Sequence, residues 1–540
     1  MRKILILLGI LISTEAFPQV GEFVITQYGA VPDGLSNNAI AIQKAIDDAH
    51  NHGGGKVIVP RGRYVTGPIH LKSNVELNIH DEAVLLGSIH ILDYKKGEIP
   101  LSLIHGEHAE NVSITGKGLI DGQCDLLLAD IFQKLRAGII KDASWKEEGE
   151  WFKRRPSEQS RPKLLEFKNC NGVTIKNIRI QNGTGWIQDY RNCDKVIIDS
   201  IDVFSNTYWN NDGIDITDSK NVRITNSRVN SSDDGICLKS EDRNSLCENV
   251  LIANCHIRSS ANAVKLGTAS HGGFRNIMVR DIEVWDTYRS VIALEAVDGG
   301  ILENIDVRNM TGVNTGNAML IRLGHRNKDN VYSRVKNIYI GNIKVQVPKG
   351  KPDAGYPIEG PLLKYPPNFV KNPANPYQSV SPWNHSTFDT TAVVYPHNVF
   401  PSSITGLPGH EPENITLENI EIHYDGGGSR ETNFFPLDSL HAITEAETSY
   451  PEFSMFGELP AWGMYVRHVK GLNMKNVRLI LNNPDYRIGM LFDDVQGLQL
   501  ENIAIPFCNA LPAILLNNVK EHSIKNMKVP GNAKTNIREQ

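Results

Sequence analysis

The sequence is poor in the features that mark several common classes of protein. Only seven of its 540 residues are cysteines, none of them forms a Cys-x-x-Cys pair, and no His/Cys cluster has zinc-site spacing. The net charge of −5 comes with no basic stripe, which argues against nucleic acid as a partner. No internal segment holds about 18 uninterrupted apolar residues, so we expect no membrane-spanning helix. We expect neither a metal nor any other cofactor.

The first nineteen residues have the pattern of a signal peptide. Arg2 and Lys3 form a basic start, residues 4–12 an apolar run, and residues 13–19 a short polar exit. The apolar run is too short to span a bilayer. We therefore expect export to the periplasm or the medium, with residues 20–540 forming one monomeric catalytic domain.

The clearest organisational signal is a repeated phrase, Asn-(Val/Ile)-x-(Ile/Val). It begins at Asn221, Asn249, Asn276 and Asn304, at separations of 28, 27 and 28 residues. Each copy alternates apolar and polar residues and favours β-branched side chains, as in a strand with one buried face. Repeats of this length predict an all-β solenoid, a parallel β-helix whose coils stack along one axis. A leucine-rich horseshoe is disfavoured because Val and Ile dominate over a leucine framework.

The pattern changes at the N-terminus and at two later interruptions. Residues 38–52 carry apolar side chains at helical spacing and are followed by Gly53, which predicts an amphipathic helix that caps the first coil. Residues at about 350–410 are rich in Pro and aromatic residues, and a second interruption covers about 425–465. We interpret both as long loop insertions, which commonly build binding walls.

Three aspartates follow the repeat in a way that predicts a site. Asp212 and Asp234 are 22 residues apart, and the same Gly-Ile pair follows each of them. They should therefore occupy one position on adjacent coils, about 4.8 Å apart, with Asp233 beside them, so that the three carboxylates meet at an open groove. Crowded carboxylates differ in pKa, and glycosidases use such a pair as acid and base. The alternative is that these residues only hydrogen-bond the turns of the stack.

These motifs resemble the polygalacturonase family, glycoside hydrolase family 28. Asn211-Asp212 is similar to the family's Asn-Thr-Asp motif, and Asp233-Asp234 to its Asp-Asp motif. Residues 28–34, 53–64 and 116–122 also resemble pectin-degrading β-helix proteins. The resemblance implies a right-handed, pectin-lyase-like parallel β-helix. It also implies that Asp233 is the general acid and that Asp212 and Asp234 activate water for inverting hydrolysis.

Two further motifs of that family are absent. Ala261-Asn262-Ala263 stands where Gly-His-Gly would fall, and Arg289-Ser-Val stands where Arg-Ile-Lys would fall. The residues with which the family binds galacturonate are therefore replaced by others in this sequence. Replacement substrate contacts are predicted on the same coils, although an exposed strand charge is the alternative for each: Lys239, Asn262, Lys265, His271, Arg289, Glu295 and Arg322. His325 and the rings of Trp186 and Trp209 are weaker candidates.

Three functions are compatible with this pattern. The leading hypothesis is a secreted hydrolase of pectic oligosaccharides or polysaccharides, which cleaves galacturonate- or rhamnose-containing linkages. The two insertions would wall off one end of the cleft and so favour exo action. A pectate-lyase-type eliminase would instead need Ca²⁺ on the carboxylates and an Arg or Lys base. A non-catalytic glycan-binding β-helix is the third alternative.

Overall fold

The computed structural model describes most of the chain. The described residues are 21–147 except 96 and 98, 155–349, 363–365, 393–395, 399–508 except 432 and 433, 512–530 and 537–540. The predicted signal peptide, residues 1–19, lies outside the described residues, as does most of the first predicted insertion. Within the described chain, no helix combines the length and apolar character needed to cross a bilayer.

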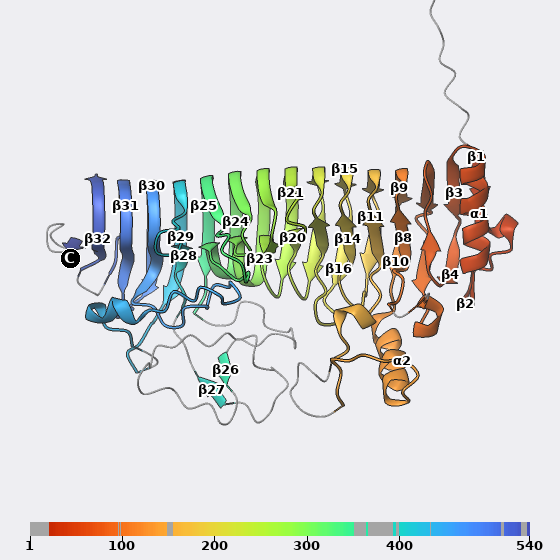
Figure 1. Ribbon diagram of the computed structural model, residues 1–540, viewed down its shortest axis with the longest axis horizontal. Coiled ribbons are helices and arrows are strands. Elements are labelled where there is room, and N and C mark those ends of the chain that lie inside the picture. Colours follow the sequence, from red (N-terminus) through yellow and green to blue (C-terminus); the bar gives the residue numbers. More distant parts are fainter. Residues whose placement is uncertain are drawn as a thin grey trace, which may run out of the picture.

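The N-terminal coils each contribute short strands to three parallel faces (Figure 1). The first face contains β1 (Gly21–Val24), β3 (Gly55–Val59), β6 (Val75–Ile79), β9 (Glu110–Gly116), β12 (Asn171–Lys176), β15 (Asp194–Asp199), β18 (Lys220–Thr225) and β21 (Cys247–Ser259). The second contains β2 (Asp33–Asn37), β4 (Gly62–Thr66), β7 (Ala83–Gly87), β10 (Leu119–Asp121), β13 (Arg179–Gln181), β16 (Asp202–Ser205) and β19 (Arg228–Ser231). The third face contains β5 (Ile69–His70), β8 (Ile104–Glu107), β11 (Leu165–Lys168), β14 (Gln188–Arg191), β17 (Ile214–Thr217), β20 (Ile236–Ser240) and β22 (Val264–Ser270).

Longer strands that bend from one face to the next dominate the C-terminal half. The strands of this half are β23 (Gly273–Ala296), β24 (Ile301–Leu323), β25 (Arg334–Val347), β28 (Ser402–Thr405), β29 (Glu413–Gly426), β30 (Ala461–Asn483), β31 (Ile488–Ala504), β32 (Ile514–Lys525) and β33 (Ile537–Glu539). The predicted right-handed parallel β-helix is confirmed.

The repeated asparagines hold the coils in register. Asn221, Asn249, Asn276 and Asn304 all adopt a left-handed backbone, with φ between 55° and 58°. The carboxamide nitrogen of each later residue donates a hydrogen bond of 3.2 Å to the carboxamide oxygen of the one before it. Asn tolerates this backbone better than other residues with a side chain. The ladder thus explains why Asn occupies this position in each repeat.

The alternating apolar residues of the coils form one continuous core. On the third face, Ile214 pairs with Ile236, which pairs with Val264, and all three side chains are fully buried. A parallel strand with one face on such a core places every second residue outside. The third face therefore presents polar residues at the positions between these apolar ones.

Helices cover the N-terminal end and one side of the β-helix. Helix α1 (Ala39–Asn51) buries Ile42 and Ile46 against the first coils, and Gly53 follows it with φ of 89°. The predicted capping helix is confirmed, including its glycine stop. Helix α2 (Cys124–Arg136) was not predicted and lies on the side of the β-helix. The 3₁₀ turns are η1 (Ile25–Tyr28), η2 (Ile91–Tyr94), η4 (Glu158–Ser160) and η6 (Leu437–Ala442).

The insertions differ in detail from the predicted bounds. Strand β28 already pairs with β24 and β30, so the coil resumes before residue 410 and the predicted end of the first insertion was too late. A strand of four residues is too short to show its periodicity in the sequence. Within the first insertion, β26 (Leu363–Tyr365) and β27 (Val393–Tyr395) pair antiparallel.

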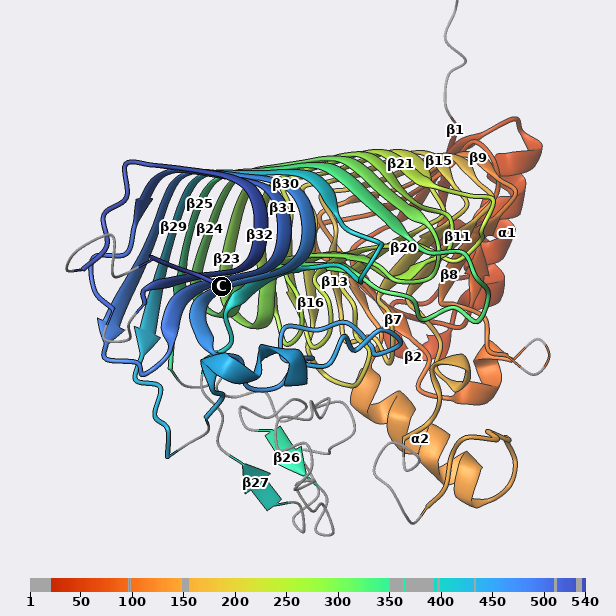
Figure 2. The ribbon, with the colours of Figure 1, turned by 60° about the vertical axis from the view of Figure 1, so that its left-hand side comes forward.

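The second insertion lies between the end of β29 at Gly426 and the start of β30 at Ala461. It has a small apolar cluster of its own against the β-helix, which includes Leu440, Met455 and Phe456. Both views place this segment on the same side of the β-helix as α2 (Figures 1 and 2).

Candidate active site

The three predicted aspartates lie in turns that enter the third face. Asp212 precedes β17, and Asp233 and Asp234 precede β20. The backbone N–H of Gly213 donates to the carbonyl oxygen of Asp234 at 2.9 Å, so the two turns stack in the predicted register. A Cβ at Gly213 would lie 2.6 Å from the carbonyl oxygen of Gly235, which explains the glycine after Asp212.

Two lysines from the third face bind the aspartates. Lys239 Nζ donates to Asp212 Oδ2 at 2.9 Å and also binds Asp215, and Lys265 Nζ donates to Asp234 Oδ2 at 3.0 Å. One carboxylate oxygen of Asp212 lies within 4.8 Å of one of Asp234. The predicted gathering of these residues on adjacent coils is therefore present in the structure.

The aspartates differ in exposure. Asp212 is 4% exposed and Asp234 is 3% exposed, whereas Asp233 is half-buried. The expectation of three carboxylates at an open groove is thus wrong for two of them. They are covered because they point at lysines of neighbouring strands, and these contacts cannot be read from local sequence. The half-buried Asp233 is the most accessible of the three carboxyl groups.

The surroundings of Asp234 hold it in the ionised form. Burial opposes ionisation, but the charges of Lys265, Arg289 and Lys239 outweigh it and lower the pKa of Asp234 to about 2. The side-chain and backbone N–H groups of Asn262 also donate to Asp234 Oδ1, at 2.9 and 3.1 Å. Asp234 is therefore a carboxylate at any physiological pH and is unsuited to donate a proton.

Glu295 and Asp215 are two further buried carboxyl groups next to this cluster. Glu295 Oε2 accepts a hydrogen bond of 2.9 Å from Thr268 and lies 3.9 Å from Lys265 Nζ. Burial raises the pKa of Glu295 to about 7, although the charge of Lys265 opposes this shift. Burial and then the charge of Asp212 raise the pKa of Asp215 well above its ordinary value, against the opposing charge of Lys239.

A bound metal ion fits this donor set poorly. Asp212, Asp234 and Cys237 offer ligand atoms within 4.8 Å of one another, close enough for one cation. However, the ammonium groups of Lys239 and Lys265 already occupy the two carboxylates. Burial also raises the pKa of the Cys237 thiol well above its ordinary value, which disfavours the thiolate that a metal needs.

The second insertion reaches into the same cluster. Lys265 Nζ donates a hydrogen bond of 2.9 Å to the hydroxyl of Tyr450. On the next coil, Arg289 Nε lies 4.0 Å from Glu452 Oε2. Residues that are far apart in sequence thus meet at the carboxylates, and the insertion forms part of the wall of the site.

Two of the predicted substrate contacts, Arg322 and His271, do not contact the carboxylate cluster. Arg322 is buried, and its guanidinium donates to the carbonyl oxygens of Gly406, Glu445 and Ala446 at 2.7–3.2 Å. It tethers the second insertion, so its prediction as a substrate contact was wrong. His271 is half-buried beyond the end of β22, and no described contact joins its side chain to the carboxylates.

Of the weaker aromatic and histidine candidates, only Trp186 contacts a residue of the carboxylate cluster. Trp209 is 9% exposed, and its carbonyl oxygen accepts a hydrogen bond of 2.6 Å from Arg161, so it belongs to the packing of the turn before Asp212. His325 stacks on Tyr332 with ring centroids 4.0 Å apart, outside the carboxylate cluster. Trp186 is half-buried, and the ammonium of Lys239 lies 3.8 Å from its ring centroid.

Sequence reasoning missed Asp215, Tyr450 and Glu452. Asp215 directly follows the Gly-Ile pair after Asp212, and its place on an outward position of β17 could have identified it. Tyr450 and Glu452 lie in an irregular insertion with no repeat to place them. Only the tertiary fold brings these two residues to the site.

The fold and the site together define a class, that of parallel β-helix proteins with an acidic cluster on one face. Comparison with known proteins then identifies the family, because the sequence profile of glycosyl hydrolases family 28 matches residues 51–356. This is more than half of the chain, and the protein belongs to glycosyl hydrolase family 28. A second profile, rhamnogalacturonase A/epimerase, pectate lyase-like, matches residues 23–78.

Individual relatives are distant. The chain is 27% identical to a probable polygalacturonase from Vitis vinifera over 53% of this chain and 60% of that protein. It is 26% identical to an exo-poly-alpha-D-galacturonosidase from Dickeya chrysanthemi over 50% and 51% of the two chains. The match thus spans little more than half the length of these relatives.

One solved structure shares the fold across nearly the whole chain. A family 28 exopolygalacturonase from Yersinia enterocolitica superposes with a TM-score of 0.54, covering 95% of this chain and 79% of that one. The sequence identity is 15%, so this likeness concerns the fold alone.

Proposed function

We propose that this protein hydrolyses glycosidic bonds of pectin-type polysaccharides that contain galacturonate or rhamnose, with inversion at the anomeric carbon. The observation that carries the proposal is the set of three aspartates on two stacked turns, of which Asp234 is held ionised and Asp233 is the most accessible. Inverting glycosidases need one protonated and one ionised carboxyl group on opposite sides of the bond.

The three residues take different parts in this reaction. Asp233 donates its proton to the glycosidic oxygen as the bond from the anomeric carbon to that oxygen breaks. Asp212 and Asp234 hold one water molecule, because oxygens within 4.8 Å of each other can both accept from a single water at about 2.8 Å. That water attacks the anomeric carbon from the other side and gives its proton to these carboxylates.

We also propose that the enzyme acts from a chain end. The second insertion supports this, because Tyr450 contacts Lys265 and Glu452 approaches Arg289 directly beside the carboxylates. A wall at this place hinders a polysaccharide from running through the site in both directions. In the same proposal, the enzyme is exported and acts as a monomer; the basic and apolar pattern of residues 1–19 supports the export.

An eliminase mechanism is less well supported by the site. It needs Ca²⁺ and a deprotonated Lys or Arg as base. Burial favours the neutral amine, but the charges of Asp212 and Asp215 outweigh it and raise the pKa of Lys239 well above its ordinary value. The charges of Asp234 and Glu295 have the same effect on Lys265. Both lysines are therefore protonated and cannot accept a proton from the substrate.

Digestion of a panel of defined pectic oligosaccharides tests the proposal. We expect release of a single small sugar from one chain end, with an anomeric configuration opposite to that of the cleaved bond when followed by NMR. The Asp233→Asn variant should release none. An unsaturated product that absorbs in the ultraviolet would contradict hydrolysis, and long mixed oligomers as first products would contradict exo action.

A further inference from the structure

A cavity lies near the C-terminal end of the β-helix, where the second insertion meets the last coils. Its volume is about 600 Å³, which is in the range of sites for small ligands. Residues 434–438 of the insertion form one wall, and residues 486–488, where β31 begins, form another. Arg430, Pro460 and Arg538 of the strand β33 complete the lining. The reaction proposed above does not use these residues.

The cavity lies on the same face of the β-helix as the carboxylate cluster but far from it. Seven in-register pairings lead from Lys265 to Arg538, through Ala293, Leu320, Ser403, Tyr465, Leu491 and Leu515. At about 4.8 Å for each step, the two ends of this path are roughly 34 Å apart. The second insertion packs on the face between them, because Tyr465, Leu491 and Leu515 belong to its apolar cluster. The cavity is therefore a site of its own and not an extension of the carboxylate cluster.

Two aromatic rings and an arginine form one side of the cavity. The ring centroids of Phe434 and Tyr486 lie 5.8 Å apart, and the guanidinium carbon of Arg430 lies 4.6 Å from the first and 5.7 Å from the second. Phe434 is 36% exposed, although it is a large apolar residue. Stacking on aromatic rings orders a guanidinium and leaves its N–H edge open to acceptors. A ligand that combines an apolar ring face with an acceptor group fits this surface.

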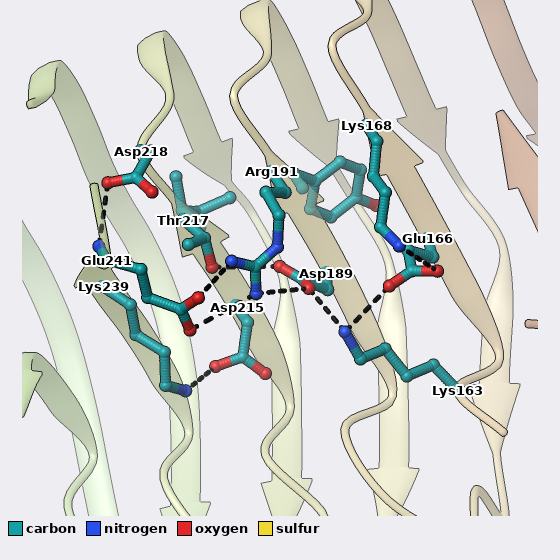
Figure 3. A network of polar contacts seen from close by, with 12 residues as sticks. Lys163, Glu166, Lys168, Asp189, Arg191, Asp215, Thr217, Asp218, Lys239 and Glu241 are labelled. Atoms are coloured by element: carbon teal, nitrogen blue, oxygen red, sulfur yellow. Dashed lines mark hydrogen bonds and ion pairs between the residues drawn. The ribbon is translucent and has the colours of Figure 1, made fainter. Parts of the chain in front are cut away.

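Two arginines of the cavity differ from the cations around β14. There, Asp189 holds both Lys163, at 2.6 Å, and Arg191, at 3.3 Å (Figure 3). Among the described residues, by contrast, no carboxylate forms an ion pair with Arg430 or Arg538. Both of these residues are exposed. An unpaired guanidinium keeps its full capacity to bind a carboxylate through two parallel hydrogen bonds.

The charge of the cavity lining is positive. Its third arginine, Arg487, is buried and lies 2.8 Å from Asp485, so its charge is compensated. Asp438 is the one carboxylate in the described lining. Glu539 is close in the chain but lies 3.2 Å from His522 instead. Two uncompensated guanidinium groups against one carboxylate favour an anionic ligand.

We infer that this cavity is a second, non-catalytic binding site for the acidic sugar units of the substrate polymer. Arg430 and Arg538 bind uronate carboxylates, and the C–H face of a sugar ring packs on Phe434. The exposed ring beside the arginines favours a ring-shaped acid over a small inorganic anion. The choice of a sugar acid rests on the proposed function. A polymer held here stays on the enzyme between cleavages, because the second insertion separates this site from the carboxylates.

Calorimetric titration of the full-length Asp233→Asn variant with a galacturonate hexamer tests the inference, because this variant should bind without cleaving. We expect binding at the cavity as well as at the carboxylates. Adding Arg430→Gln and Arg538→Gln together should remove one class of binding site or weaken it by about tenfold or more, as for the loss of charged hydrogen bonds. Phe434→Ala should weaken the same class.

The matched control removes two other exposed arginines. Arg280→Gln and Arg308→Gln take the same charge from ion pairs with Asp281 and Asp306, so each dissociation constant should change by less than about threefold. Two further ligands separate charge from sugar recognition. The hexamer with its carboxyl groups reduced should lose the arginine-dependent binding, and a glutamate hexamer should bind more weakly because it lacks the sugar ring.

Protection from phenylglyoxal is a second measurement, and it needs no substitution in the cavity. This reagent modifies accessible guanidinium groups, and mass spectrometry gives the rate at each arginine. The galacturonate hexamer should slow the modification of Arg430 and Arg538 and leave that of Arg308 unchanged. The result is therefore informative even if the variant with both arginines replaced does not fold.

Two outcomes would overturn the second binding site. One is unchanged binding of the galacturonate hexamer after Arg430→Gln and Arg538→Gln, with no protection of Arg430. The other is equally tight binding of the glutamate hexamer, which would show a general anion surface. The proposed function is tested separately: if the natural sequence cleaves no pectic oligosaccharide while arginine-dependent binding persists, the hydrolase proposal fails and the second binding site stands.

Discussion

Asp233 and Asp234 are neighbours in the chain, but their side chains have different surroundings. Asp234 is buried and accepts hydrogen bonds from Lys265 and Asn262, whereas Asp233 is half-buried and its Oδ1 accepts from the backbone N–H of Asp234 at 2.9 Å. Under the proposed function, the ionised Asp234 takes part as the base and the more accessible Asp233 as the acid. This difference in surroundings arises because Asp234, and not Asp233, faces Lys265.

Lys265→Met tests the pairing at the residue scale. Removal of the lysine leaves the buried Asp234 carboxylate without its cation, so its pKa should rise and the acidic limb of the pH–activity profile should move to higher pH. The free energy of unfolding at neutral pH should fall by about 3–5 kcal/mol. Chemical denaturation and a pH–rate profile measure the two effects. Lys336→Met is the control, because its pair with Glu303 is less buried than that of Lys265 with Asp234, and it should cost at most about 1 kcal/mol.

Glu295 should make stability depend on pH. Its folded-state pKa of about 7 lies above its ordinary value of 4.5, so folding favours the protonated form. Its contribution to stability is then complete below about pH 4.5 and is lost as the pH rises to about 7, with a total of about 3 kcal/mol. Glu295→Gln should flatten this part of the curve in denaturation experiments between pH 4.5 and 7. An unchanged pH dependence would show that Glu295 ionises normally.

At the scale of elements, the asparagine ladder holds one coil on the next. Asn276 donates a hydrogen bond to Asn249 and accepts one from Asn304, each of 3.2 Å, and its φ is 56°. The two contributions, side-chain bonding and backbone conformation, can be separated by substitution because glycine tolerates the backbone and alanine does not.

Asn276→Gly should lose only the two hydrogen bonds, and Asn276→Ala should lose them and strain the backbone as well. We expect the free energy of unfolding to fall by about 1 kcal/mol for Gly and by about 1–2 kcal/mol more for Ala. Urea denaturation of both variants gives the comparison. Equal losses in the two variants would show that the left-handed backbone carries no cost at this position.

The second insertion depends on Arg322 as a tether. Its guanidinium holds backbone carbonyl oxygens of Glu445 and Ala446 from a strand of the β-helix. Arg322→Ala should loosen the segment between Gly426 and Ala461, so limited proteolysis should cut there faster and the first digestion products should include longer oligosaccharides. Arg308→Ala, which removes an exposed arginine paired with Asp306, should change neither. A rise in KM alone, without faster proteolysis, would instead favour substrate binding by Arg322.

At the scale of the whole molecule, the solenoid spreads the working parts along one axis. The capping helix α1 closes one end, and the carboxylates lie in the turns that enter the third face at β17 and β20. Under the proposed function, a substrate chain laid along this face would meet successive coils in order.

Export is the prediction that concerns the whole chain. When the full sequence is expressed in a Gram-negative host, we expect the protein in the periplasm or the medium with a mature N-terminus near residue 20, as measured by fractionation and mass spectrometry. A chain that lacks residues 1–19 should stay in the cytoplasm. A cytoplasmic full-length protein that retains Met1 would contradict the prediction.

Much of the fold was predictable because the period of the sequence is the period of the structure. The spacing from Asn221 to Asn304 gave the coil length, and the helical spacing before Gly53 gave α1. The short strand β28 and helix α2 were not predicted, since four residues show no periodicity and α2 interrupts the repeat. In the site, the stacking of Asp212 on Asp234 was predictable, but their burial was not.

The sequence by itself determined the coil, its register and the alignment of the acidic residues, because local alternation and a fixed repeat act along the whole chain. Only the tertiary structure decided that Lys239 and Lys265 face the aspartates, that Arg322 tethers an insertion, and that Tyr450 reaches the site. These contacts join residues from different coils and loops, and their energies depend on burial and on charges from several strands at once. Such contacts between distant residues cannot be inferred from local sequence.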